Sequence, residues 1–240
     1  MMRLVVTNDD GFDSPGIGAL VHAAGNFGEP IVVAPAAAQS GVGHQLTVDA
    51  PIRVERVREQ GYRVEGKPAD CARLALTELA PGADWLLAGI NHGANLGADV
   101  YTSGTVAAAR EAALLGCRAL ALSQYIGRER TVDWTVTARR AASVLRILLA
   151  RDLPAGHFWN VNLPHPPGSA IELPIVFCGL DTRPHGVRYR REGSDFIYAG
   201  DYHYAGDYHT RPRQVGRDVD VCLSGRVAVT LVTLEIAADG

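Results

Sequence analysis

The chain has 240 residues, of which 47% are hydrophobic and 20% are charged, so it can bury a full core within one large domain. The formal net charge is -3 and there is no long run of lysine or arginine, which disfavours a nucleic acid polymer as a partner. No stretch approaches the ~20 apolar residues of a membrane span, so we expect no membrane contact and a cytoplasmic location.

Cysteine spacing excludes two further classes of protein. The four cysteines are widely separated and form no C-x-x-C pair, which argues against a zinc site or a disulfide framework. We expect them to pack as small apolar residues.

The first half of the chain alternates short apolar runs with helical patterns, which predicts a doubly wound α/β fold with a parallel sheet. The expected strands are residues 3–7, 31–34, 85–88, 118–123 and 158–163, and the expected helices are 15–25, 68–79, 105–115 and 133–150. Three strand-like pieces at 45–48, 52–57 and 62–64 are too closely spaced for helices between them and predict a hairpin excursion. The last helix has the amphipathic spacing of a surface helix, with Arg139, Arg140 and Arg146 on its polar face.

Beyond residue 164 the chain changes character, with proline and glycine punctuation followed by a six-residue duplication at 198–203 and 204–209. The duplication is too short for a solenoid repeat. We therefore predict two parts: an α/β core over 1–174 that carries the functional site, and an arm of strands, hairpins and turns over 175–240. Residues 195–211 alternate aromatic and polar side chains, including Tyr198, Tyr202, Tyr204 and Tyr208, with little aliphatic material for an independent core. A hairpin of this kind is expected to pack on another subunit, as a dimer or a pair of dimers.

Ligands of open α/β sheets bind beyond the carboxyl ends of the strands, and the end of the first expected strand is acidic. Asp9 and Asp10 follow the apolar run directly, and Gly11 permits a bend that brings both carboxylates onto one cation. Hard oxygen ligands suit Mg²⁺ or Mn²⁺. The alternative is a solvated acidic turn with an Asx-type hydrogen bond.

Two more strand ends carry unusual sequence. After the second strand, a loop of alanines and glycines contains Ser40, whose hydroxyl can reach a metal or a phosphate, and His44, which is more typical of loop packing than of a general base. After the third, Asn91 and Asn95 supply neutral oxygen ligands and donors among three glycines. Ser103 and Thr105 then stand at a helix start, where exposed backbone amides form a phosphate site, although Ser103 also suits a plain helix cap.

With these segments in view, the sequence resembles the SurE survival-protein family of metal-dependent nucleotidases. The matching segments are TNDDG (7–11), AP followed by SG (34–41), GKPADC (66–71), AGINHGANLGADVYTSGTVAAARE (88–111) and NVNLP (160–164), with a weaker echo at 217–230. They run in order through nearly the whole chain.

The resemblance implies that Asp9, Asp10, Ser40 and Asn91 hold one divalent metal ion, Mg²⁺ or Mn²⁺, and that Asn95, Ser103, Gly104 and Thr105 receive the phosphate. It also implies a Rossmann-like three-layer αβα core whose C-terminal arm is exchanged between subunits, giving a homodimer or homotetramer. Two departures from the family pattern are the stretch at 36–39, where polar residues are usual, and Lys67, where a threonine is expected. Both leave the substrate preference open.

The expected reaction is hydrolysis of nucleoside monophosphates to nucleoside and phosphate, assisted by the metal and without a covalent intermediate. The expected substrates are 5'-nucleotides, and whether 3'-nucleotides are also substrates stays open. Asp9 and Asp10 are the expected catalytic residues, and one of them, preferentially Asp9, can accept a proton from the attacking water. An aspartyl-phosphate phosphatase of the haloacid dehalogenase type is disfavoured, because its two acids are two residues apart. A dinucleotide-binding domain is disfavoured because Gly16 and Gly18 have no third glycine at the required spacing. A non-catalytic metal or nucleotide sensor on the same fold stays open.

Overall fold

The computed structural model describes residues 1–166, 168–184, 186–199 and 208–235. Within these residues, nine strands form one sheet with the order β3-β4-β2-β1-β5-β6-β7-β11-β8. The strands are β1 (Met2–Thr7), β2 (Gly28–Pro35), β3 (Val54–Arg58), β4 (Gly61–Val64), β5 (Trp85–His92), β6 (Arg118–Gln124), β7 (His157–Leu163), β8 (Ile175–Phe177) and β11 (Val227–Thr233). Neighbouring strands are parallel except β3 with β4 and β7 with β11. The predicted α/β class with a mostly parallel sheet is confirmed.

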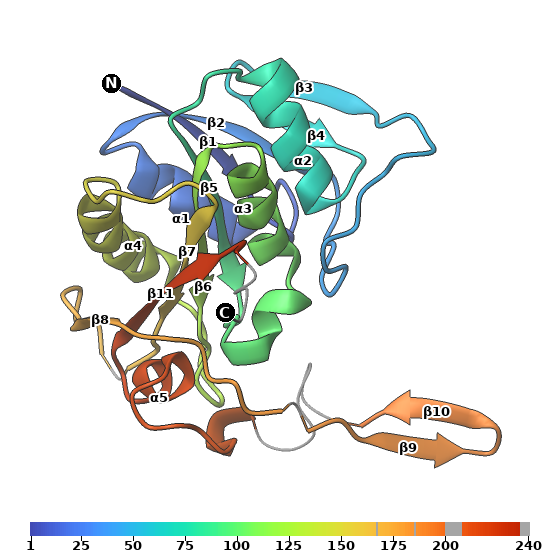
Figure 1. Ribbon diagram of the computed structural model, residues 1–240, viewed down its shortest axis with the longest axis vertical. Helices are drawn as coiled ribbons and strands as arrows, with labels where there is room; N and C mark the ends of the chain where they lie inside the picture. Colours follow the sequence, from blue (N-terminus) through green and yellow to red (C-terminus); the bar gives the residue numbers. More distant parts are fainter. Residues whose placement is uncertain (167, 185, 200–207, 236–240) are drawn as a thin grey trace, which may run out of the picture.

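Helices cover both faces of this sheet (Figure 1). One face carries α1 (Pro15–Ala24) and α4 (Trp134–Leu148), and the other carries α3 (Gly104–Leu114) and α2 (Pro68–Leu74), which continues as the π-helical turn η1 (Ala75–Leu79). A short helix, α5 (Asp218–Leu223), packs on β11. No helix among the described residues has both the length and the apolar character that a membrane span requires.

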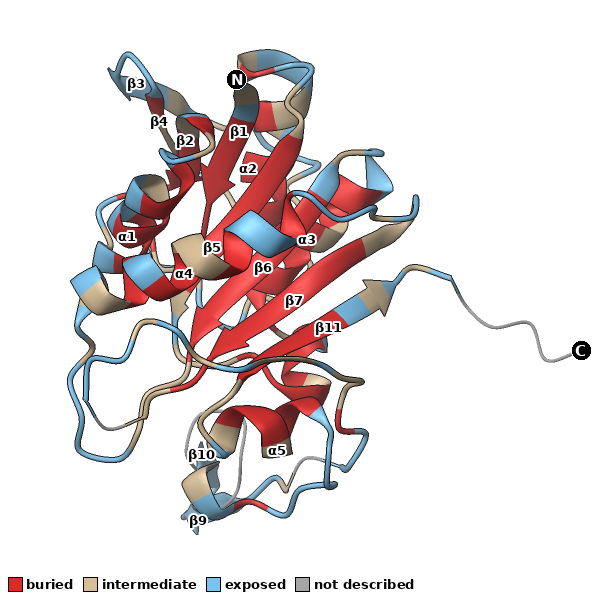
Figure 2. Ribbon diagram, turned by 90° about the vertical axis from the view of Figure 1, so that its left-hand side faces the viewer, coloured by how far each residue is buried: buried red, intermediate tan, exposed pale blue. Residues whose placement is uncertain are grey.

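The alternation of side chains along β1 explains the three layers. Leu4 and Val6 belong to the core between the sheet and α1 and α4, whereas Val5 belongs to the core on the α2 and α3 side. Successive residues of a strand point to opposite faces, so an unbroken apolar run is the pattern of a strand buried on both sides. Figure 2 shows the central strands buried along most of their length.

The strand order brings predicted site residues together at one edge of the sheet. The chain passes from β1 to β2 on one side and later returns on the other side of β1 as β5. Such a reversal leaves a crevice at the carboxyl ends of the strands beside it. Asp9 follows β1 and Asn91 lies near the end of β5, so two predicted metal ligands meet at this crevice.

The prediction of a strand at residues 45–48, the first of the three strand-like pieces, is wrong. Residues 45–48 form a loop, and only β3 and β4 pair as a hairpin. The reason is a side chain: the backbone N–H and the hydroxyl of Thr47 both donate to the Asp70 carboxylate, at 2.9 and 2.8 Å. The hydrogen bond that a strand would have made to a neighbour is made to a carboxylate at the start of α2 instead.

Two other predictions need correction. Strand β5 runs through His92, where a loop was expected from Gly89, so Asn91 is held by a strand. Arg140 was assigned to the polar face of α4, but it is 4% exposed and its Nε donates to the backbone oxygen of Ala170 at 2.9 Å. Periodicity alone missed this because residues far along the chain cover that side of the helix.

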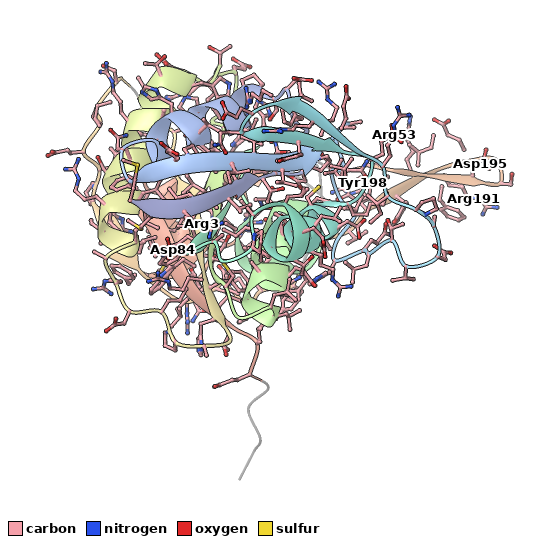
Figure 3. The ribbon with its side chains drawn as sticks, turned by 90° about the horizontal axis from the view of Figure 1, so that it is seen from above. Arg3, Arg53, Asp84, Arg191, Asp195 and Tyr198 are labelled. Carbon is pink, nitrogen blue, oxygen red and sulfur yellow. The ribbon has the colours of Figure 1, made fainter. Side chains whose placement is uncertain are left out.

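The C-terminal part is divided between the sheet and a projecting hairpin. Strands β8 and β11 join the main sheet, and only β9 (Tyr189–Glu192) and β10 (Asp195–Tyr198) form a separate antiparallel pair. This hairpin extends away from the body of the molecule, as Figures 1 and 3 show. Most of the duplicated segment, including Tyr202 and Tyr204, lies outside the described residues. The division at residue 174 stays a prediction.

Candidate active site

The turn after β1 is built around Asn8. This side chain is fully buried, donates from Nδ2 to the backbone oxygen of Gly11 at 2.9 Å and to Ser14 Oγ at 2.7 Å, and accepts from Gly11 N–H at 3.2 Å. Gly11 has a φ of 101°, a region in which an L side chain is strained. The Asx-type turn and the proposed cation site are therefore compatible. The Asn8 side chain makes the hydrogen bonds of the turn, so neither Asp9 nor Asp10 is needed for them.

Asp9 and Asp10 sit in different surroundings. Asp9 is 4% exposed and accepts a hydrogen bond from the Thr105 hydroxyl. Burial raises the pKa of Asp9 to about 6; the hydrogen bond from Thr105 opposes this shift, and the negative charge of Asp10 adds to it. Asp10 is half-buried and accepts the backbone N–H of His92 at 2.9 Å. Burial also raises the pKa of Asp10, and that hydrogen bond opposes the shift.

Gly104 lets helix α3 approach Asp9 closely. A methyl group at this position would lie 2.9 Å from Asp9 Cβ, 3.0 Å from Asp9 Oδ2 and 3.1 Å from Pro68 Cγ, too close for a normal contact. The backbone N–H of Thr105 also favours the charged form of Asp9. The positive end of the α3 dipole is therefore directed at a carboxylate that desolvation would otherwise neutralise.

The loop after β5 is held in place by two asparagines of β7. The side chains of Asn160 and Asn162 donate to the backbone oxygen of Asn95 at 2.9 and 3.0 Å, and Asn162 Oδ1 accepts its N–H at 2.8 Å. The side-chain amide of Asn95 donates to Ser123 Oγ at 2.8 Å. Two buried asparagines on the same face of an apolar strand were the sequence signal for this clamp, since buried polar groups need partners.

The segments meet at a cavity of about 480 Å³. Six of the eight predicted site residues line it: Asp9, Asp10, Ser40, Asn91, Asn95 and Ser103. Gly104 and Thr105 are not among the lining residues: the Thr105 hydroxyl donates to Asp9, and Gly104 leaves space that a side chain would take from Asp9. Ser103 caps α3, since its hydroxyl accepts from Val106 N–H at 3.1 Å.

The loop that carries Ser40 is tied to the site on both sides. Gln39 N–H donates to the backbone oxygen of Asp9 at 2.7 Å, and Gly43 N–H donates to that of Thr102 at 3.0 Å. His44 does not line the cavity; its Nε2 lies 2.7 Å from the buried carboxylate of Glu111. The packing interpretation of His44 therefore fits better than a catalytic one.

The donor atoms at the cavity suit a hard divalent cation. Two carboxylates, the Asn91 side-chain oxygen and the Ser40 hydroxyl are all oxygen donors, and Asn91 Oδ1 lies 3.5 Å from the Thr105 hydroxyl that holds Asp9. Within the described residues, no three His, Cys, Asp or Glu side chains come together as a metal cluster. Oxygen donors with only two charges match Mg²⁺ or Mn²⁺ better than zinc.

Comparison with known proteins identifies the family of this chain. The family model described as "Survival protein SurE" matches residues 4–184. The chain belongs to the SurE family. Among similar SurE-family members, a protein of Synechocystis sp. is 47% identical over 229 residues, 95% of this chain and 98% of that protein. The 5'-nucleotidase SurE of Pelobacter propionicus is 44% identical over 204 residues, 80% of this chain and 82% of its own.

A solved structure supports the SurE fold. The crystal structure of the SurE protein from Aquifex aeolicus superposes with a TM-score of 0.82 and is 31% identical, covering 98% of this chain and 94% of that one. The sheet with helices on both faces is thus that of the SurE family.

Sequence reasoning missed three residues of the cavity wall: Tyr125, Ile126 and His209. Tyr125 and Ile126 follow β6, which lies beside β5 in the sheet. His209 comes from the last copy of the duplicated segment, and no spacing rule connects it to β6. The position of Tyr125 directly after a strand could have identified it from the sequence. No feature of the sequence could have identified His209.

Proposed function

We propose that this protein is a divalent-metal-dependent 5'-nucleotidase that hydrolyses nucleoside monophosphates to nucleoside and phosphate. The observation that carries the proposal is the convergence of Asp9, Asp10 and Asn91 with the start of α3 at one cavity. The family relationship supports it, since the relative from Pelobacter propionicus is named a 5'-nucleotidase. The cytoplasmic location stays a prediction from the sequence.

In this proposal Asp9, Asp10, Ser40 and Asn91 would hold one Mg²⁺ or Mn²⁺ ion, which would supply charge to polarise the phosphoryl group and to orient water. Thr105 keeps Asp9 in place through its hydroxyl, and His92 N–H does the same for Asp10. Asn95 and the 103–105 helix start stabilise the charge on the phosphate, because backbone N–H groups at a helix N-terminus favour anions. Asp9 or Asp10 accepts the proton of the attacking water.

Lys67, which stands where the SurE family pattern has a threonine, does not line the cavity. Lys67 Nζ donates to Gln39 Oε1 at 2.9 Å, and neither residue lines the cavity. Gln39 precedes Ser40, and the backbone N–H of Gln39 donates a hydrogen bond to the backbone oxygen of Asp9. We therefore assign Lys67 a role in holding the Ser40 loop, which leaves the metal donors unchanged.

The test is phosphate release from nucleoside monophosphates by the purified protein, with added Mn²⁺ or Mg²⁺ and with a chelator. We expect turnover that depends on the metal and is abolished by the chelator. A protein that binds Mn²⁺ and nucleotide without releasing phosphate would be a sensor instead. Trapping of an acid-stable phosphoaspartate would favour an aspartyl-phosphate mechanism, although Gly11 occupies the position two residues after Asp9.

We also propose that the β9–β10 hairpin mediates assembly into a homodimer or homotetramer. Phe196 and Ile197 in β10 are 66% and 40% exposed, and Tyr189 and Tyr198 stack edge to face with ring centroids 5.7 Å apart. Figure 3 shows Arg191 and Asp195 at the far end of the hairpin, away from the body of the molecule. A two-stranded hairpin is at best marginally stable alone, so a partner surface would stabilise it.

Replacing Phe196 with Asp is expected to shift the protein to monomer, because a buried unpaired charge opposes association. Sedimentation velocity at micromolar concentration measures the change. Ser194→Asp is the matched control, since Ser194 lies in the exposed turn between the two strands and should leave assembly intact. A parent protein that sediments as a monomer would rule out the proposed assembly.

A further inference from the structure

The cavity that contains the aspartates extends to an aromatic wall. Its lining includes Tyr125 and Ile126, which follow β6, and His209, which lies in the 3-10 turn η3 (Tyr208–Thr210). Strand β5 lies between β1 and β6, and adjacent strands are about 4.8 Å apart, so Tyr125 stands roughly 10 Å across the sheet edge from Asp9. A sugar between a phosphate and a base can bridge a gap of this order.

Tyr125 and His209 form a defined pair. Their ring centroids are 5.6 Å apart with an interplanar angle of 67°, and Tyr125 Oη lies 2.5 Å from His209 Nδ1. Both side chains are half-buried. Edge-to-face rings make a corner of aromatic surface, and the hydrogen bond keeps the two rings in this orientation.

Contacts outside the pair hold both Tyr125 and the segment of His209 in position. Tyr125 N–H donates to the backbone oxygen of Leu163 at 2.9 Å. Two residues after His209, the buried Arg211 makes an ion pair with Asp99 at 3.5 Å, and Asp99 itself lines the cavity. The C-terminal segment is therefore attached to the loop that presents Asn95, and His209 has a fixed place in the wall.

Other aromatic side chains near the site are less suitable. Tyr101 is 72% exposed and does not line the cavity. His92 lines this cavity as well as a neighbouring one of about 550 Å³, but it is exposed, and its ring lies beside Trp134 of the neighbouring cavity, with centroids 6.1 Å apart. That second cavity includes Asp10 but lacks Asp9, Asn95 and Ser103, so a substrate there would not have its phosphate on the α3 start.

We propose that the base of the nucleotide stacks on Tyr125 and His209, and that this pair makes the protein prefer nucleotides to phosphate esters without a base. The inference rests on the proposed nucleotidase function and adds to it the residues that determine substrate specificity. Stacking on an aromatic face tolerates every base, because every base has a π face. The pair therefore selects the class of substrate without selecting one nucleobase.

The test compares kcat/KM for AMP, GMP, CMP and UMP with kcat/KM for ribose 5-phosphate, which has the same phosphate and sugar but no base. Tyr125→Leu and His209→Ala are each expected to lower kcat/KM for all four nucleotides by about 10-fold or more and to change that for ribose 5-phosphate less than about twofold. Tyr125→Phe keeps the ring but removes its hydrogen bond to His209, so its loss on nucleotides should be smaller than that of Tyr125→Leu. Tyr101→Leu makes the same chemical change outside the cavity and should leave both substrate types unaffected.

Several results would overturn this inference. Equal losses on nucleotides and ribose 5-phosphate would mean a general lesion, and unchanged nucleotide kinetics in both variants would mean that no base touches the pair. Melting temperatures identify a variant that fails to fold, and the remaining variant then decides. A parent enzyme that hydrolyses ribose 5-phosphate as well as AMP would also contradict the preference. A parent with phosphatase activity on neither would instead contradict the proposed function.

Discussion

Asp9→Asn and Asp10→Asn are expected to lower kcat/KM for nucleotides by about 10³-fold or more. Each substitution keeps side-chain size and removes one of the two negative charges that would hold the proposed cation, whose charge stabilisation would be worth several kcal/mol in the transition state. The metal-induced rise in melting temperature should shrink in parallel, because stabilisation by a ligand follows its affinity. Phosphate release and Mn²⁺-dependent thermal shift, measured on the same samples, check both effects.

Without metal, Asp9→Asn should stabilise the fold. The carboxyl group of Asp9 has a pKa of about 6 in the folded chain against 3.8 in the reference state. The folded state therefore holds this proton more tightly than the unfolded state, and the resulting stability is lost as pH rises from about 4 to about 6. At pH 7 the loss is on the order of 2–3 kcal/mol, which asparagine at this position avoids.

Urea unfolding in chelator at pH 4 and pH 7 measures this linkage. The parent should lose stability from this group across that interval, and the Asp9→Asn variant should lose correspondingly less. A solvated acidic turn predicts changes of about 0.5 kcal/mol or less and normal activity. Variants that bind Mn²⁺ tightly and hydrolyse nucleotides at the parent rate would end the assignment of the metal to Asp9 and Asp10.

Gly104→Ala is expected to lower kcat/KM by about 10²-fold while the protein still folds. The added methyl group would meet Asp9 Cβ at 2.9 Å and Pro68 Cγ at 3.1 Å, so either Asp9 or the start of α3 must move. Displacements of about 1 Å in a catalytic arrangement cost about this much, whereas overpacking costs typically about 1–3 kcal/mol of stability. Metal affinity should fall as well, because either movement changes the contact between Thr105 and Asp9, a proposed metal ligand.

Gly18→Ala is the matched control for this substitution. Gly18 lies inside α1, is exposed, and has no neighbour within 4 Å of an added Cβ. Alanine there should stabilise the helix by about 1 kcal/mol and leave activity unchanged. Steady-state kinetics, metal titration and thermal melts on both variants separate the steric effect from a general glycine-to-alanine effect. Parent-like activity and metal affinity in Gly104→Ala would show that α3 does not position Asp9.

The central strands could be predicted because they are buried on both faces, so their apolar runs are a local property. The same holds for the start of α1 at Pro15, since proline has a fixed φ and lacks the N–H that a first helical turn leaves unpaired. Residues 45–48 could not be assigned correctly. Their strand-like composition was overridden by Asp70, a partner 23 residues away from Thr47.

At the site, the chemistry of the donor groups could be predicted from local sequence. Two adjacent aspartates after an apolar strand, a serine in a loop and two asparagines among glycines all carry side-chain oxygens. Local spacing also determined that Ser103 stands at a helix start, where it caps α3.

The tertiary structure alone decided which partners these groups have. Thr105 holds Asp9 across 96 residues, Asn162 holds Asn95 across 67, and His209 meets Tyr125 across 84. The switch in strand order brings the ends of β1, β5 and β6 to one edge, and that order is a global property of how the sheet is assembled. Composition and periodicity act over a few residues, so they determine the elements and the chemistry of each segment, whereas the pKa of Asp9 and the aromatic wall depend on which segments fold side by side.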